Sequence, residues 1–161
     1  GFSSRLFLSV REKNGLCYNI SAGTNHFREN DAEFIINTGI KQGSLKKTLN
    51  LIMKEIKNLK TKKISKKEMT RVFNNMRNKY LLKYEDSENL AEYYAVEELY
   101  KKKIRPFYTI IEQILSDKSQ IKAKDLQEIC KKYLTFEKMH IVVAGKVEPE
   151  NVKKIVENLK L

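Results

Sequence analysis

The sequence predicts an α+β domain built around an antiparallel pair of strands. Apolar residues first recur at helical spacing, then alternate with polar residues as they do in strands, and then return to helical spacing for most of the chain. Helices and strands do not alternate regularly, as they would in a doubly wound parallel sheet. With 161 residues, 41% of them hydrophobic, the chain has the size and composition of a single folded domain over residues 1–161.

The first residues predict a short helix that ends at a glycine. Ser3 or Ser4 can cap its N-terminus, because a serine hydroxyl accepts a hydrogen bond from a free N–H group of the first turn. Gly15, which follows Asn14, can end the helix, because glycine readily adopts the left-handed conformation found after helices. The apolar residues expected on its buried face are Leu6, Phe7 and Val10.

Two strands are predicted next. Residues 16–22 alternate in polarity, which is typical of a half-buried strand, and polar residues from 23 to 31 predict a loop. A second strand begins at Phe34 and ends near Gly39, and the loop length favours an antiparallel pair. The side chains expected on one face of the first strand are Leu16, Tyr18, Ile20 and Ala22, with Cys17, Asn19 and Ser21 on the other.

Most of the remaining chain is predicted to be helical. Ser44 can cap one helix. Ser65 and Glu68 form a capping box at the start of another, and Ile64 and Met69 fit the hydrophobic staple beside it. The helix that begins at Ser65 is predicted to reach about residue 103, with a possible break near residues 86–87. The later elements expected are a helix from Pro106, a helix over residues 123–133 with Leu126, Ile129 and Cys130 inward, a buried strand over residues 139–144, and an amphipathic helix from Pro149.

The composition excludes several classes of protein. Lys and Arg number 32 against 20 Asp and Glu, so the net charge is +12 and nucleic-acid binding has to be considered. Arg, which makes bidentate contacts to bases, is scarce among these cations, so the favoured interpretation of the positive charge is a solvated surface.

No apolar run approaches the ~20 residues that span a membrane, and no secretory signal is visible. We therefore expect a cytoplasmic protein in which Cys17 and Cys130 are reduced thiols.

The residues that could hold a metal ion do not form a known motif. His26 and His140 are the two histidines of the chain, and neither has a His or carboxylate partner at i+3 or i+4 that forms a known ligand motif. His140 falls within a predicted strand, where a structural histidine is the better interpretation, and His26 falls in a predicted polar loop. We expect no metal ligand and no cofactor in this chain.

One pair of residues suggests chemistry. Arg11 ends the first predicted helix, and Tyr18 lies seven positions on, across the Gly15 turn. A helix, a turn and a strand fold back on one another, so both side chains could point into one cleft. A guanidinium and a phenol are donors suited to holding a peptide carbonyl or a developing oxyanion. On spacing alone the pattern is not specific.

The sequence around this pair resembles the second, zinc-free domain of the insulinase-like zinc metallopeptidases, the family of pitrilysin and mitochondrial processing peptidase. Residues 3–7 read Ser-Ser-Arg-Leu-Phe, and residues 10–18 read Val-Arg-Glu-Lys-Asn-Gly-Leu-Cys-Tyr, close to the family stretch Arg-Glu-Lys-x-Gly-Leu-x-Tyr. Asn14 and Cys17 stand where the family often has Arg and a small residue. The resemblance continues at residues 34–39, 86–92, 125–127 and 141–145.

The resemblance implies a half-clamshell domain whose antiparallel sheet is covered by helices on one side. Two such domains enclose a chamber in which peptides are cut, and zinc is bound in the other half by His-x-x-Glu-His and a distant Glu. By residue match, Arg11 would orient the substrate backbone and Tyr18 would donate to the scissile carbonyl oxygen. The relatives also imply that this chain is an N-terminally incomplete part of a longer polypeptide, lacking roughly 20–40 residues of an ordinary domain.

Two functional interpretations follow from the resemblance. In the first, the chain is the substrate-positioning half of a zinc endopeptidase and is inactive without a zinc-bearing domain or subunit in cis or in trans. In the second, it is a non-enzymatic relative that keeps the fold as an assembly scaffold. Retention of both Arg11 and Tyr18 favours the first. A basic nucleic-acid-binding module is a third interpretation and rests on the net charge alone.

Overall fold

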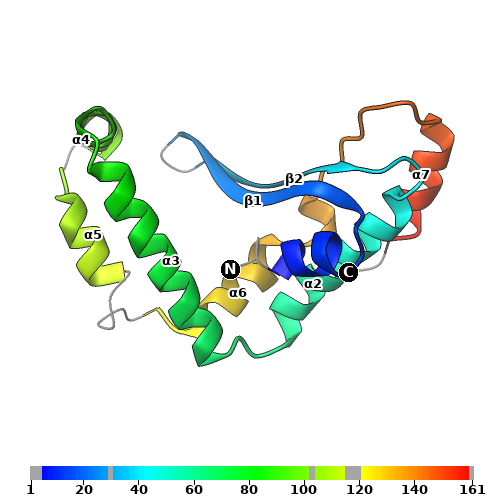
Figure 1. Ribbon diagram of the computed structural model, residues 1–161, viewed down its shortest axis with the longest axis horizontal. Helices are drawn as coiled ribbons and strands as arrows, with labels where there is room; N and C mark the ends of the chain where they lie inside the picture. The colour runs from blue at the N-terminus through cyan, green and yellow to red at the C-terminus, as the bar shows by residue number, and fades with distance from the viewer. Residues whose placement is uncertain (1–4, 29–30, 102–103, 115–120, 160–161) are drawn as a thin grey trace. The chain divides into compact units, whose positions relative to one another are not determined.

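The structure is a computed structural model that describes residues 5–28, 31–101, 104–114 and 121–159 (Figure 1). The predicted caps Ser3 and Ser4 lie outside the described residues. The elements in chain order are the π-helix η1 (Phe7–Glu12), strands β1 (Cys17–Arg28) and β2 (Asp31–Ile40), helices α2 (Leu45–Thr61), α3 (Lys66–Tyr84), α4 (Ser87–Lys101), α5 (Phe107–Ile114) and α6 (Ala123–Tyr133), the 3-10 helix η2 (Phe136–Lys138) and helix α7 (Pro149–Glu157).

The chain divides into two compact units. The first contains α3, α4 and α5 together with residues 24–34 at the outer end of the β1–β2 hairpin. The second contains η1, the inner part of the hairpin, α2, α6, η2 and α7. The α+β class is confirmed, because a strand pair and helices make up the described chain. A single domain over residues 1–161 stays a prediction.

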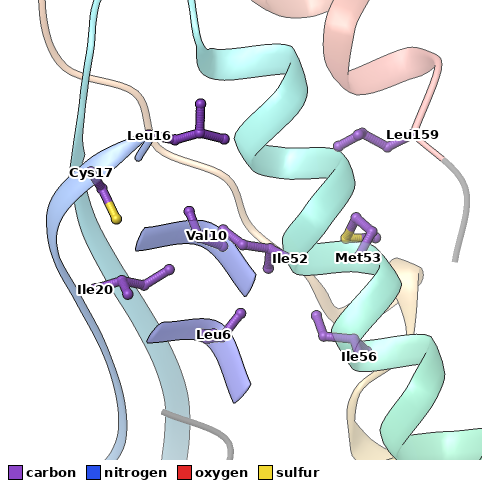
Figure 2. Close-up of a cluster of buried hydrophobic side chains, with 9 residues drawn as sticks. All are labelled: Leu6, Val10, Leu16, Cys17, Ile20, Ile52, Met53, Ile56 and Leu159. Atoms are coloured by element: carbon purple, nitrogen blue, oxygen red, sulfur yellow. The ribbon is translucent and has the colours of Figure 1, made fainter. Parts of the chain in front are cut away.

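The core of the second unit lies between η1, β1 and α2. Leu6 and Val10 are fully buried and point from the N-terminal helix towards Ile52 and Ile56 on α2 (Figure 2). This is the buried face predicted for the first helix, although its hydrogen bonds are of the wider π type. The other buried members of the cluster are Leu16, Cys17, Ile20, Met53 and Leu159.

The two strands form an antiparallel hairpin, as predicted, but the hairpin is longer than predicted. The Thr38 hydroxyl donates to the carbonyl of Asn19 at 2.9 Å, and the Asn25 amide donates to the Glu33 carboxylate at 3.0 Å. The predicted loop over residues 23–31 is wrong, because β1 extends to Arg28 and β2 already begins at Asp31. Polar, exposed residues occupy much of this outer part, so polarity does not alternate there although the backbone is paired.

The burial of β1 departs from the predicted alternation. Cys17, predicted on the face opposite Leu16, is buried with it, whereas Tyr18 is 89% exposed. Ile20 is buried again, as predicted. Leu16 and Cys17 both pack in the core because the strand begins beside η1, with the Leu16 N–H donating to the Val10 carbonyl at 3.1 Å. Tyr18 is therefore free of the core.

The strand predicted over residues 139–144 is wrong. The segment has no strand hydrogen bonding to the described residues, although its side chains alternate in burial. Met139 and Ile141 pack against the core cluster, whereas Val142 is 91% exposed. The largely apolar segment therefore packs alternate side chains against the core, and β pairing needs a neighbouring strand in addition.

The helices α3, α4 and α5 of the first unit begin close to the predicted positions. The Glu68 N–H donates to the Ser65 hydroxyl at 3.2 Å, which confirms the cap of α3. The predicted break lies between α3 and α4, where the Asn89 N–H donates to the Asp86 carboxylate at 3.0 Å. The helix expected from Pro106 is α5, which begins one residue later.

Two helices of the second unit correct details of the prediction. Ser44 precedes α2 as expected, but its hydroxyl donates to the Lys41 carbonyl and does not accept a bond from the helix. On α6, Leu126 and Cys130 are half-buried, whereas Ile129, predicted to face inward, is 55% exposed. In the described parts of the chain, no helix is long and apolar enough to cross a membrane.

The packing of η1 against α2 gives a first testable prediction. Replacing Ile56 by alanine removes a side chain that is 2% exposed. The Ile56→Ala change should lower the free energy of unfolding by about 2–5 kcal/mol, because burial is lost and a cavity remains. Equilibrium urea unfolding measures this change.

The neighbouring exposed position provides the control. Lys57→Ala on the solvent side of α2 should change the free energy of unfolding by no more than about 0.5 kcal/mol. Equal effects of the two substitutions would show that η1 and α2 do not pack as described.

Candidate functional site

Arg11 is placed by a short π-helix. The Lys13 N–H donates to the Leu8 carbonyl, five residues earlier, at 3.0 Å, which is the wide spacing of this helix type. Val10, immediately before Arg11, is fully buried, so the core holds this turn from one side. Arg11 itself lies at an exposed position. Single π-helical turns are frequent at functional sites.

The turn after Arg11 is fixed by further hydrogen bonds. Gly15 has a φ of 57°, a left-handed conformation that suits glycine, and its N–H donates to the Arg11 carbonyl at 2.8 Å. The Asn14 side-chain amide donates to the Ser9 carbonyl at 2.8 Å. The predicted helix stop at Gly15 is confirmed, and the backbone that carries Arg11 is held at both ends of the turn.

Tyr18 is placed by the first residues of β1. Its neighbours Cys17 and Ile20 are buried in the core, while Tyr18 is 89% exposed. A phenol in this position has its hydroxyl free to donate to a ligand. Arg11 and Tyr18 thus both lie in the second unit, on consecutive elements, and both are accessible. That their side chains reach one peptide stays a prediction.

One contact of this site was not predicted from the sequence. The Cζ atom of Arg11 lies over the ring of Phe7, 4.6 Å from the ring centroid. Phe7 was assigned to the buried face of the helix, and it does pack, half-buried, against the core cluster. The signal that could have revealed the contact is the spacing of four residues between an aromatic ring and an arginine on one helix.

In the described part of the chain, the side chains that could bind a metal ion do not gather into a site. Among the described residues, no group of three His, Cys, Asp or Glu side chains lies close enough to hold a metal ion. His140 is exposed, so its assignment to a buried strand is wrong. His26 lies in β1, and its side chain is outside the described part of the structure. The described donor set therefore does not fit a zinc ion.

The cysteines do not resemble catalytic thiols. Cys17 and Cys130 are both free, the first buried and the second half-buried. Burial raises the pKa of Cys130, while the charges of Arg5 and Lys60 act in the opposite direction. A raised pKa disfavours the thiolate, which is the nucleophilic form. Arg11 and Tyr18 remain the candidate residues.

Comparison with known proteins addresses the resemblance directly. The family model described as the Peptidase M16 inactive domain matches residues 1–76, which include η1, both strands and α2. Residues 1–76 are thus similar in sequence to the second domain of the insulinase-like peptidases. The expected resemblance is thus confirmed over the segment that contains Arg11 and Tyr18. The comparison with curated proteins gives no match.

A solved structure extends the similarity beyond this segment. The chain is similar to a conserved protein from Enterococcus faecalis V583, with 26% sequence identity and a TM-score of 0.66. The match covers 80% of this chain and 28% of that protein. The chain therefore spans less than a third of the length of this relative.

The histidine content of the chain predicts how much zinc it retains. After dialysis against zinc-free buffer, it should retain well below one equivalent of metal, because two histidines far apart in the sequence cannot supply the three or four ligands of a zinc site. Elemental analysis of the dialysed protein measures this. One stoichiometric equivalent of zinc that survives dialysis would contradict the assignment to the zinc-free half.

Proposed function

We propose that this chain is the substrate-positioning and oxyanion-stabilising half of a zinc-dependent endopeptidase. It acts with a zinc-bearing half, in the same polypeptide or in a partner subunit, on peptides held in the chamber between them. The observation that carries the proposal is the retention of Arg11 and Tyr18 at exposed positions within the segment that matches the M16 inactive domain.

Arg11 would hold the backbone of the substrate. Its guanidinium is charged at every physiological pH and presents several N–H donors in one plane, which suits carbonyl oxygens of an extended peptide. The hydrogen-bonded turn around Arg11 limits the backbone movement of this residue, so little order has to be created when a peptide binds. Arg11 therefore contributes mainly to substrate binding.

Tyr18 would act on the reacting carbonyl. Its phenol O–H can donate a hydrogen bond to the carbonyl oxygen, and that bond strengthens as the oxygen gains negative charge in the tetrahedral transition state. The zinc-bearing half would supply the metal and the activated water. Tyr18 therefore contributes mainly to turnover.

An assembly scaffold is the second candidate, and the description of the matching family as an inactive domain favours it. A scaffold keeps the fold and the interface with its partner but has no need for a guanidinium and a phenol as substrate donors. The two functions are separated by conservative substitutions that leave the fold intact and remove only these donors.

Tyr18→Phe is the sharpest such substitution. It keeps the ring and removes one donor, and the exposed position of Tyr18 makes an effect on folding small. In the enzyme reconstituted with its zinc-bearing half, turnover should fall roughly 10²–10³-fold, or about 3–4 kcal/mol in activation free energy. Steady-state cleavage of a peptide substrate measures kcat and KM.

Tyr108→Phe provides the matched control. Tyr108 is an exposed tyrosine on α5, 61% exposed, and the family motif does not include it. Its substitution should leave kcat unchanged. If the Tyr18→Phe enzyme also turns over normally, Tyr18 has no role in the reaction and the scaffold function becomes the better one.

Arg11→Lys tests the second donor. Lysine keeps the charge but loses the planar arrangement of donors, so we expect KM to rise roughly tenfold if Arg11 binds backbone carbonyls. Arg71→Lys, at an exposed position of α3, is the control and should behave as the wild type. An unchanged KM for Arg11→Lys would exclude specific carbonyl binding by the guanidinium.

A further inference from the structure

The contact between Arg11 and Phe7 joins the proposed substrate donor to the core. The Arg11 guanidinium lies over the Phe7 ring, with Cζ 4.6 Å from the centroid, inside the range of a cation–π interaction. The ring in turn packs against the buried cluster that contains Leu6 and Val10. Phe7 therefore packs against the core on one side and contacts the Arg11 guanidinium with its ring face.

The backbone and the ring restrict different parts of Arg11. The bonds from Lys13 to Leu8 and from Gly15 to the Arg11 carbonyl fix the peptide backbone of the turn. They do not fix the four side-chain torsions of arginine, whose rotamer freedom is the main entropy still to be lost on binding. The Phe7 ring is the contact that selects among those rotamers.

A ring suits this purpose better than a carboxylate. An aromatic face attracts the charge of a guanidinium through its quadrupole. A carboxylate would instead accept hydrogen bonds from two N–H groups of the fork and make them unavailable to a substrate carbonyl. A ring contact thus orients the guanidinium while leaving the donors of the fork for the peptide.

We propose that Phe7 is a positioning residue for Arg11: its ring holds the guanidinium in the orientation that binds the backbone of the peptide substrate. The inference rests on the proposed function, because Arg11 must bind substrate for its orientation to matter. Phe7 touches no reacting atom, so it should affect substrate binding and leave the chemical step unaltered.

The test uses the enzyme reconstituted with its zinc-bearing half and a peptide substrate. Phe7→Leu keeps an apolar side chain for the core and removes the ring, so KM should rise about 2–5-fold with kcat unchanged, as expected for loss of one exposed cation–π contact. Phe7→Tyr keeps the ring and should retain the wild-type KM. If Phe7→Leu does not fold, Phe7→Met gives the same test with a more adaptable side chain.

A double-mutant cycle separates positioning from a structural role. In an Arg11→Ala background, Phe7→Leu should have no further effect on KM, because the group it orients is gone. The same rise in KM in both backgrounds would show that Phe7 acts through the fold, and it would overturn the inference. A normal KM for Phe7→Leu, with Arg11→Ala impaired, would also overturn it and leave the proposed function standing. A normal KM for Arg11→Ala would overturn both the inference and the substrate-binding role proposed for Arg11, while the role of Tyr18 is decided separately by Tyr18→Phe.

Discussion

The burial of Leu6 and Val10 against α2 is the contact on which the candidate site depends. Both side chains are fully buried, and each contributes about 1.5–3 kcal/mol of hydrophobic free energy. They fix the face that η1 turns towards the core (Figure 2). Arg11 follows directly after Val10 in the sequence. The same cluster contains Cys17 and Ile20, which hold the start of β1 on either side of Tyr18. One apolar cluster therefore supports both candidate residues while leaving them exposed.

Sequence patterns predicted those features that depend on neighbours along the chain. The cap at Ser65, the stop at Gly15 and the break before Ser87 were predicted correctly, because each depends on a hydrogen bond or a φ angle within a few residues. The antiparallel pair and the α+β class also follow from local periodicity. Arg11 and Tyr18 were found by resemblance to a family motif, and their spacing alone would not have selected them.

The features that were predicted wrongly depend on contacts between distant parts of the chain. Residues 139–144 are largely apolar, which favours a buried strand, but pairing requires another strand beside them, and the sequence of the segment does not show whether there is one. The outer part of the hairpin is paired although its sequence does not alternate between apolar and polar residues. A prediction based on that alternation therefore ended the first strand too early and began the second too late. Ile129 occupies a helical position that predicts burial, yet it is 55% exposed, because burial depends on what packs against α6.

An arginine that binds a substrate has to be ordered before binding, and its N–H donors also have to be unoccupied. A donor that binds a substrate has to be ordered beforehand, or the entropy of ordering is lost from the binding free energy. An arginine side chain is usually ordered by an ion pair with a carboxylate. That ion pair also occupies the N–H groups, which are then unavailable to the substrate. At Arg11 the order comes instead from a π-helical turn, from hydrogen bonds made by Gly15 and Asn14, and from the Phe7 ring. These contacts act on the backbone and on the charge, so under the proposed function a peptide carbonyl would not have to displace a carboxylate in order to bind Arg11.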